Sequence, residues 1–94
     1  MKVSKTVIIS QHAQLQMLLR GTDESEVLKT IEQGQWIPAK YERFQSKLRF
    51  AFDKPSPING IIYRFKDVEP VFKEENDYII VITVKVYYSD KCEV

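Results

Sequence analysis

The sequence is poor in the residues that build cross-linked or metal-linked scaffolds. It contains one cysteine and one histidine among 94 residues. A lone cysteine, Cys92, can form no disulfide within the chain, which argues against a disulfide-stabilised secreted domain. One histidine and one distant cysteine do not supply the ligand cluster of a zinc site. We therefore expect neither a metal nor another cofactor.

Long apolar runs are also missing. The first ten residues, MKVSKTVIIS, lack the continuous apolar stretch and the small-residue cleavage site of a signal peptide. No segment approaches the ~20 apolar residues that cross a membrane as a helix. We therefore predict a cytoplasmic protein with no membrane partner.

Neither sign of charge dominates. Fourteen Lys and Arg residues against thirteen Asp and Glu residues give a net charge of +1. Because nucleic-acid-binding domains usually carry a basic excess, an RNA site in this chain would need local clustering of cations. The length and the 44% hydrophobic content are typical of one small globular unit. We expect a single domain over residues 1–94.

Hydrophobic periodicity and capping residues predict a helical hairpin after a short strand. β-Branched residues over 3–9 indicate the strand, and Ser10 and Gly21 are typical of the start and end of the first helix. Asp23 opens a capping pattern for a second helix, which Gly34 ends. Three leucines are expected to form the buried side of the first helix: Leu15, Leu18 and Leu19.

After Pro38 the period changes to that of strands. Residues 43–52 alternate, with apolar side chains on one side and basic ones on the other. Residues 63–72 form another strand, for which Pro70 favours an edge position, and residues 78–88 are typical of a covered central strand. We predict an α+β fold of order β-α-α-β-β-β, with the helix hairpin on one face of a three- to four-stranded antiparallel sheet.

The single histidine belongs to a polar stripe on the first predicted helix. His12, Gln16 and Arg20 recur every four residues, beside the three leucines. An imidazole in such a stripe could act as a general base. Alternatively, His12 and Arg20 could bind backbone carbonyls and hold the helix against the sheet. The sequence leaves both interpretations open.

Cations and one tyrosine could share the outward side of the predicted sheet. Cations on a rigid sheet can hold a phosphodiester, and a tyrosine can stack on a base. An ordinary solvated sheet face is the alternative, because the register between strands is not readable from sequence. The candidate residues on the three long strands are Arg43, Lys47, Arg49, Arg64, Lys66, Thr83, Lys85 and Tyr87.

Several segments together resemble a known family. "HA" and "RG" at the ends of the first helix, "EVLKTIEQG", and the ending "KDVEPVFKEENDYIIVITVKVYY" are similar to domain-of-unknown-function family 4258. That family resembles a branch of the RelE/BrnT-like superfamily, whose characterised members are ribonuclease toxins of toxin–antitoxin pairs. The resemblance implies a RelE-like fold, RNA as substrate and an antitoxin protein as partner. The matching positions are His12, Arg20, Lys66, Tyr87 and Tyr88, whereas many members have arginine in place of Gln16.

The implied activity is metal-independent RNA cleavage. A base takes the proton of a 2′-hydroxyl, that oxygen attacks the adjacent phosphate, and cations stabilise the developing charge. The resemblance implies catalytic roles for His12, Arg20 and Tyr87. The expected RNA-binding residues are Lys47, Arg49, Lys66 and Lys85. The alternative is a non-catalytic module that keeps the fold and pairs with a partner protein, or with itself as a homodimer, through a strand edge at 3–9 or 63–72.

Overall fold

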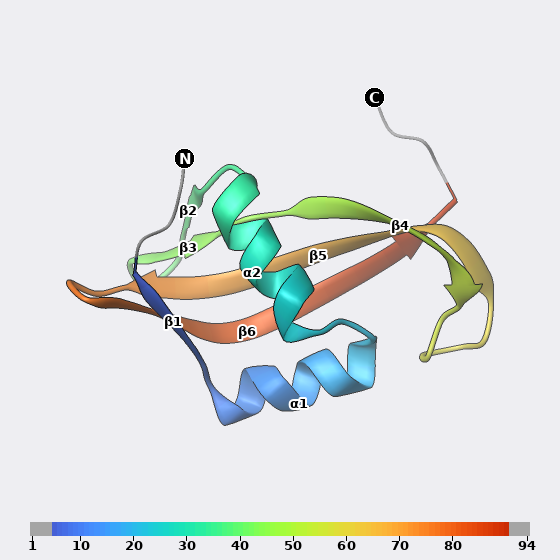
Figure 1. The fold of residues 1–94 in the computed structure, drawn as a ribbon, viewed down its shortest axis with the longest axis horizontal. Coiled ribbons are helices and arrows are strands. Elements are labelled where there is room, and N and C mark those ends of the chain that lie inside the picture. Colours follow the sequence, from blue (N-terminus) through green and yellow to red (C-terminus); the bar gives the residue numbers. More distant parts are fainter. Residues whose placement is uncertain (1–4, 91–94) are drawn as a thin grey trace.

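The computed structural model describes residues 5–90, which form two helices and one sheet (Figure 1). In chain order the elements are β1 (Thr6–Ile9), α1 (Gln11–Arg20), α2 (Glu24–Gln33), β2 (Ile37–Ala39), β3 (Arg43–Gln45), β4 (Leu48–Pro55), β5 (Ile62–Glu74) and β6 (Tyr78–Ser89). The strands follow the order β1-β6-β5-β3-β2, and β4 also pairs with β5. The predicted α+β class is confirmed. Cys92 and the start of the predicted first strand lie outside the described residues.

The sheet differs from the predicted one in the number, order and direction of its strands. The described residues contain six strands instead of three or four, because the chain from 37 to 55 is divided into β2, β3 and β4. β1 pairs in parallel with β6, with Thr6 opposite Tyr78, so the sheet is mixed and not antiparallel. A parallel pair joins segments that are distant in sequence, so no local sequence pattern predicts it.

Both helices begin at the predicted capping residues. The Ser10 hydroxyl accepts the Ala13 N–H at 3.1 Å, and Gly21 ends α1 with a left-handed φ of 86°. The Asp23 carboxylate accepts the Glu26 N–H at 2.9 Å at the start of α2. These contacts satisfy main-chain groups that a helix leaves unpaired at its ends. The two predicted helices and their boundaries are confirmed, but they do not pack against each other as a hairpin: α1 lies on β6 and α2 on β5.

The buried side of α1 is not the predicted one. Ala13 is 0% and Met17 7% exposed, whereas the three leucines are 55–77% exposed. The prediction that Leu15, Leu18 and Leu19 face the core is therefore wrong. α1 lies alongside β6 (Figure 1), where a small alanine and one methionine suffice to fill the contact. Apolar residues on two sides of one helix do not reveal which side is covered.

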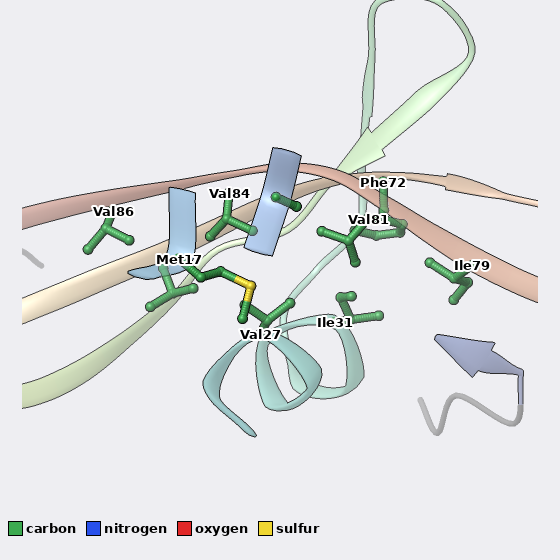
Figure 2. Close-up of a cluster of buried hydrophobic side chains, with 10 residues drawn as sticks. Met17, Val27, Ile31, Phe72, Ile79, Val81, Val84 and Val86 are labelled. Atoms are coloured by element: carbon green, nitrogen blue, oxygen red, sulfur yellow. The ribbon is translucent and has the colours of Figure 1, made fainter. Parts of the chain in front are cut away.

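The core lies between α2 and the middle of the sheet. Val27 and Ile31 of α2 contact the buried side chains of β5 and β6 (Figure 2). Trp36 closes one end of this cluster: its ring meets Phe72 edge-on, with the ring centroids 4.9 Å apart, and its indole N–H donates to the Ile31 carbonyl at 2.8 Å. The side chains of both helices therefore enter one core on the same face of the sheet, as predicted.

The predicted edge position of Pro70 is also wrong. β5 pairs with β6 on one side and with β3 and β4 on the other. The Pro70 carbonyl accepts the Ser46 N–H at 3.3 Å. In an antiparallel strand the nitrogen and the carbonyl of one residue face the same neighbour, so the Pro70 nitrogen, which has no hydrogen, faces the break between β3 and β4. A proline is tolerated there because the ladder is interrupted. Residues 63–72 consequently offer no free edge to a partner strand.

One irregularity in β6 decides which of its side chains enter the core. Its pairing with β5 shifts by one residue at Ile82, which makes this residue a β-bulge. Val81 and Val84 are therefore both fully buried and point toward α2, although they are three positions apart (Figure 2). The exposed Lys85 and Tyr87 lie on the opposite face of β6.

The burial of α1 gives a direct test of the fold. We expect Met17→Ala to lower the free energy of unfolding by about 2–5 kcal/mol, because it removes a buried side chain and leaves a cavity. In dilute protein, Leu18→Ala should change it by no more than about 0.5 kcal/mol, because that side chain lies in solvent. Urea unfolding followed by circular dichroism measures both. A larger loss for Leu18→Ala than for Met17→Ala would contradict the observed orientation of α1.

Candidate functional site

The polar stripe of α1 holds the edge of β6. β1 pairs with β6 only as far as Val81. Beyond that point, Gln16 Oε1 accepts the Val84 N–H at 3.1 Å, and Arg20 Nη1 donates to the Val84 carbonyl at 2.9 Å. The Thr83 hydroxyl donates to the same Gln16 oxygen. Main-chain groups that have lost their strand partner are thus paired by side chains. Arg20 thus binds a backbone carbonyl, as one of the two interpretations of the sequence proposed, and Gln16 shares this structural role, which was not predicted for it.

The three residues implied to be catalytic do not form one cluster. His12 is exposed at the start of α1, eight residues from Arg20, or about 12 Å along a helix axis. Tyr87 extends from the face of β6 opposite the core. Its neighbour Tyr88 points to the helix side, where its hydroxyl donates to the Arg20 carbonyl. The structure therefore separates His12 from Tyr87 and uses Tyr88 to fix the end of α1.

Lys66 does not lie on the expected cationic surface. Its ammonium group is buried on the helix side, 2.7 Å from a Glu26 carboxylate oxygen and 2.8 Å from the Gly21 carbonyl oxygen. The Phe52 ring centroid lies 5.1 Å away. Alternation along β5 places Lys66 on the same side as the buried Val68, so the prediction that it lies on the outward surface with the other cations is wrong. It connects the α1–α2 turn to the sheet.

The other predicted RNA-binding residues do share a surface. The alternation predicted over 43–52 is confirmed: Phe44 and Phe50 pack against the core, and the basic side chains point away from it. We call the surface opposite the helices the helix-free face. Its members are Arg43, Gln45, Lys47, Arg49, Phe65, Asp67, Glu69, Val71, Thr83, Lys85 and Tyr87.

Part of the positive charge on this face is already neutralised. Arg49 binds both carboxylate oxygens of Asp67, at 2.8 and 3.2 Å. The Lys47 ammonium lies 3.9 Å from the same carboxylate. The Arg49 guanidinium also covers the Phe65 ring at 5.0 Å from its centroid. On this face, the Asp67 carboxylate therefore competes with any phosphate for Arg49 and Lys47.

Tyr87 lies between a cation and a carboxylate. The Lys47 ammonium is 5.1 Å from its ring centroid, and its hydroxyl donates to Glu69 at 3.4 Å. Burial, and after it the nearby Glu69 carboxylate, raise the pKa of Tyr87 above its usual value, while Arg20 opposes this shift. Tyr87 therefore keeps its proton at neutral pH and can act as a donor or a stacking ring.

A hollow of about 720 Å³ opens beside this face, between the β2–β3 hairpin and β6. Three cations line it, Lys40, Arg43 and Lys85, and no carboxylate does. The Arg43 guanidinium lies 5.7 Å from the ring centroid of Tyr41, which also lines the hollow. The hollow thus combines positive charge with an aromatic ring.

The turn that carries Tyr41 is strained. Tyr41 and Glu42 have φ values of 62° and 57°, in the left-handed region that favours glycine. Such a conformation costs about 1–3 kcal/mol per residue and is concentrated at functional sites. The Tyr41 side chain is 81% exposed, so no core packing explains the strain. Sequence reasoning missed Lys40 and Tyr41, because neither residue type marks a turn of this kind.

The described residues contain neither a membrane-spanning helix nor a cluster of metal ligands. No helix there is long and apolar enough to cross a membrane. Across residues 5–90, no group of three or more His, Cys, Asp or Glu side chains could hold a metal ion. Comparisons with protein-family models, curated proteins and solved structures find no match.

The contacts of α1 with Val84 give a second test. We expect Gln16→Ala and Arg20→Ala each to cost about 1–3 kcal/mol of stability, because each leaves a partly buried main-chain group of Val84 unpaired. For a domain of this size that is roughly 4–8 °C in melting temperature per kcal/mol. Differential scanning calorimetry measures the shift.

Two variants are matched controls for this experiment. Gln16→Glu keeps an oxygen that can accept the Val84 N–H and should retain most of the stability. The exposed His12 should tolerate His12→Ala within about 0.5 kcal/mol. If His12→Ala were as destabilising as Arg20→Ala, the histidine would have a structural role that its exposed position does not suggest.

Proposed function

We propose that the protein binds single-stranded RNA on its helix-free face, with the hollow beside β2 and β3 as the centre of the site. The observation that carries this proposal is the lining of the hollow: Lys40, Arg43 and Lys85 line it together with the exposed Tyr41, and no carboxylate does. Cations bind phosphates, and an exposed ring can stack on a base. The strained turn at Tyr41 supports a functional role over a merely solvated surface.

The aromatic residues favour a single strand over a duplex. A base can stack on a side chain only when it is free of its own helix. Tyr87 provides a second half-exposed ring on the same face, with Lys47 beside it. A strand crossing the sheet from Tyr41 to Tyr87 would meet a cation at each ring.

The resemblance to the RelE/BrnT-like superfamily extends this proposal to RNA cleavage. Tyr87 is the implied catalytic residue that lies on the helix-free face, and its hydroxyl donates to Glu69. In the proposed reaction Glu69 takes the 2′-hydroxyl proton, O2′ attacks the phosphorus, and Tyr87 gives its proton to the departing O5′. The products are a 2′,3′-cyclic phosphate and a 5′-hydroxyl, and Glu69 returns the proton to Tyr87. Lys47 stabilises the charge on the phosphate.

Neutralising the hollow tests RNA binding. We expect Arg43→Gln combined with Lys85→Gln to weaken binding of a fluorescently labelled single-stranded RNA by at least about tenfold at low salt. The slope of log affinity against log salt should become shallower by about 0.7 for each phosphate contact that is lost. Fluorescence anisotropy over a salt series measures both quantities.

Lys29→Gln is the matched control, because Lys29 is an exposed cation on α2. The α2 helix covers the other face of the sheet. This variant should bind nearly as well as the wild type. Equal loss of affinity in the control and the double variant would show that only overall charge matters. Salt-independent binding, or binding unaffected by the double variant, would overturn the proposal.

Cleavage requires a separate experiment. We expect Tyr87→Phe and Glu69→Gln each to lower the rate of RNA cleavage by about 10²–10⁴, the usual contribution of a general acid or base, while RNA affinity stays within a few-fold of wild type. His12→Ala should cleave at the wild-type rate. If only His12→Ala abolished cleavage, the assignment of Glu69 and Tyr87 would be wrong. RNA binding without cleavage by the wild type would reject the ribonuclease activity and leave the binding site in place.

A further inference from the structure

The outward side of α1 is apolar although the rest of the chain does not cover it. Leu15, Leu18 and Leu19 are each more than half exposed. At about 100° per residue these leucines span roughly 100° of the helix, on the side away from the buried Met17. Single exposed leucines are common, but three within five residues make a continuous apolar surface of the kind that marks an interface.

The outward side of α1 also carries no carboxylate, lysine or arginine. α1 contains no Asp, Glu or Lys, and its one arginine, Arg20, is engaged with the Val84 carbonyl. The leucines share the outward side with Gln11 and His12, both exposed. An RNA or a strongly charged protein would find no complementary charge on this side.

We propose that this side of α1 is a dimer interface, on which the leucine surface of a second copy of the chain packs. In a two-fold dimer the same patch meets itself, so a lysine or carboxylate near the two-fold axis would face its own like charge. A patch without these residues escapes that repulsion. Two copies of α1 running antiparallel would also place the positive end of each helix dipole near the negative end of the other.

The size of α1 sets the strength of this dimer. A helix of ten residues is about 15 Å long, so one helix pair buries less than the ~1,200 Å² typical of a stable complex. The dimer should therefore form reversibly and at micromolar or higher concentration. This interface differs from the strand edges considered from sequence, and it does not depend on the proposed RNA site.

Sedimentation velocity over about 5–500 μM protein tests the interface, a range that brackets a weak association. We expect a monomer–dimer equilibrium in the wild type. Leu15→Glu, at the centre of the leucine surface, should weaken dimerisation by at least about tenfold, because a carboxylate would be buried against apolar side chains. The Leu15 side chain is more than half exposed in the monomer, so the circular dichroism spectrum and the melting temperature of the variant at low concentration should match those of the wild type.

Ile58→Glu is the matched control, because Ile58 is a 60% exposed apolar residue outside α1. It adds the same charge and should dimerise like the wild type. A wild type that stays monomeric across the whole range would overturn the proposal. So would assembly beyond two chains, or a dimer that Leu15→Glu leaves intact or that Ile58→Glu disrupts equally.

Discussion

The arrangement of this protein depends on how the edge of β6 is paired after β1 ends. β6 is twelve residues long, and the four residues of β1 pair with its first part only. Backbone N–H and C=O groups on an open strand edge attract other chains. Here Gln16 and Arg20 bind both such groups of Val84, so a helix replaces the missing strand. This substitution requires α1 to lie alongside the strand, and its position determines much of the molecular surface.

Two surfaces result from that position of α1. Gln16 and Arg20 of its polar stripe bind the edge of β6, and its buried residues Ala13 and Met17 pack in the core. The leucines lie on the remaining side of the helix and are exposed to solvent. α2 alone is left to cover the centre of one sheet face, and the opposite face stays open for cations. Charge is then distributed unevenly in a nearly neutral chain. The buried Lys66 is paired with Glu26, and Arg49 on the helix-free face is paired with Asp67, whereas no carboxylate lines the hollow that Lys40, Arg43 and Lys85 share.

The features that could be predicted from sequence are those with local causes. Ser10, Gly21 and Asp23 act on main-chain groups within a few residues, and the helices begin and end accordingly. Alternation over 43–52 placed Arg43 and Lys47 correctly, because neighbouring side chains of a strand point to opposite faces. The features that were missed depend on distant segments: the parallel pairing of β1, the bulge at β6 and the side of α1 that is covered. Lys66 was misplaced because only the register of β5 shows its burial.

The two proposed surfaces are compatible with each other because they lie on different parts of the fold. The hollow is bordered by the β2–β3 hairpin, and α1 lies on the far side of β5 and β6 from that hairpin (Figure 1). Pairing through the leucines of α1 therefore leaves the hollow of each copy open. A dimer would present two copies of a weakly charged site, so an RNA strand bound to one copy would find the second at high effective concentration. Two sites joined in this way would compensate for the small net charge of the single chain, which by itself provides little long-range attraction for an anion such as RNA.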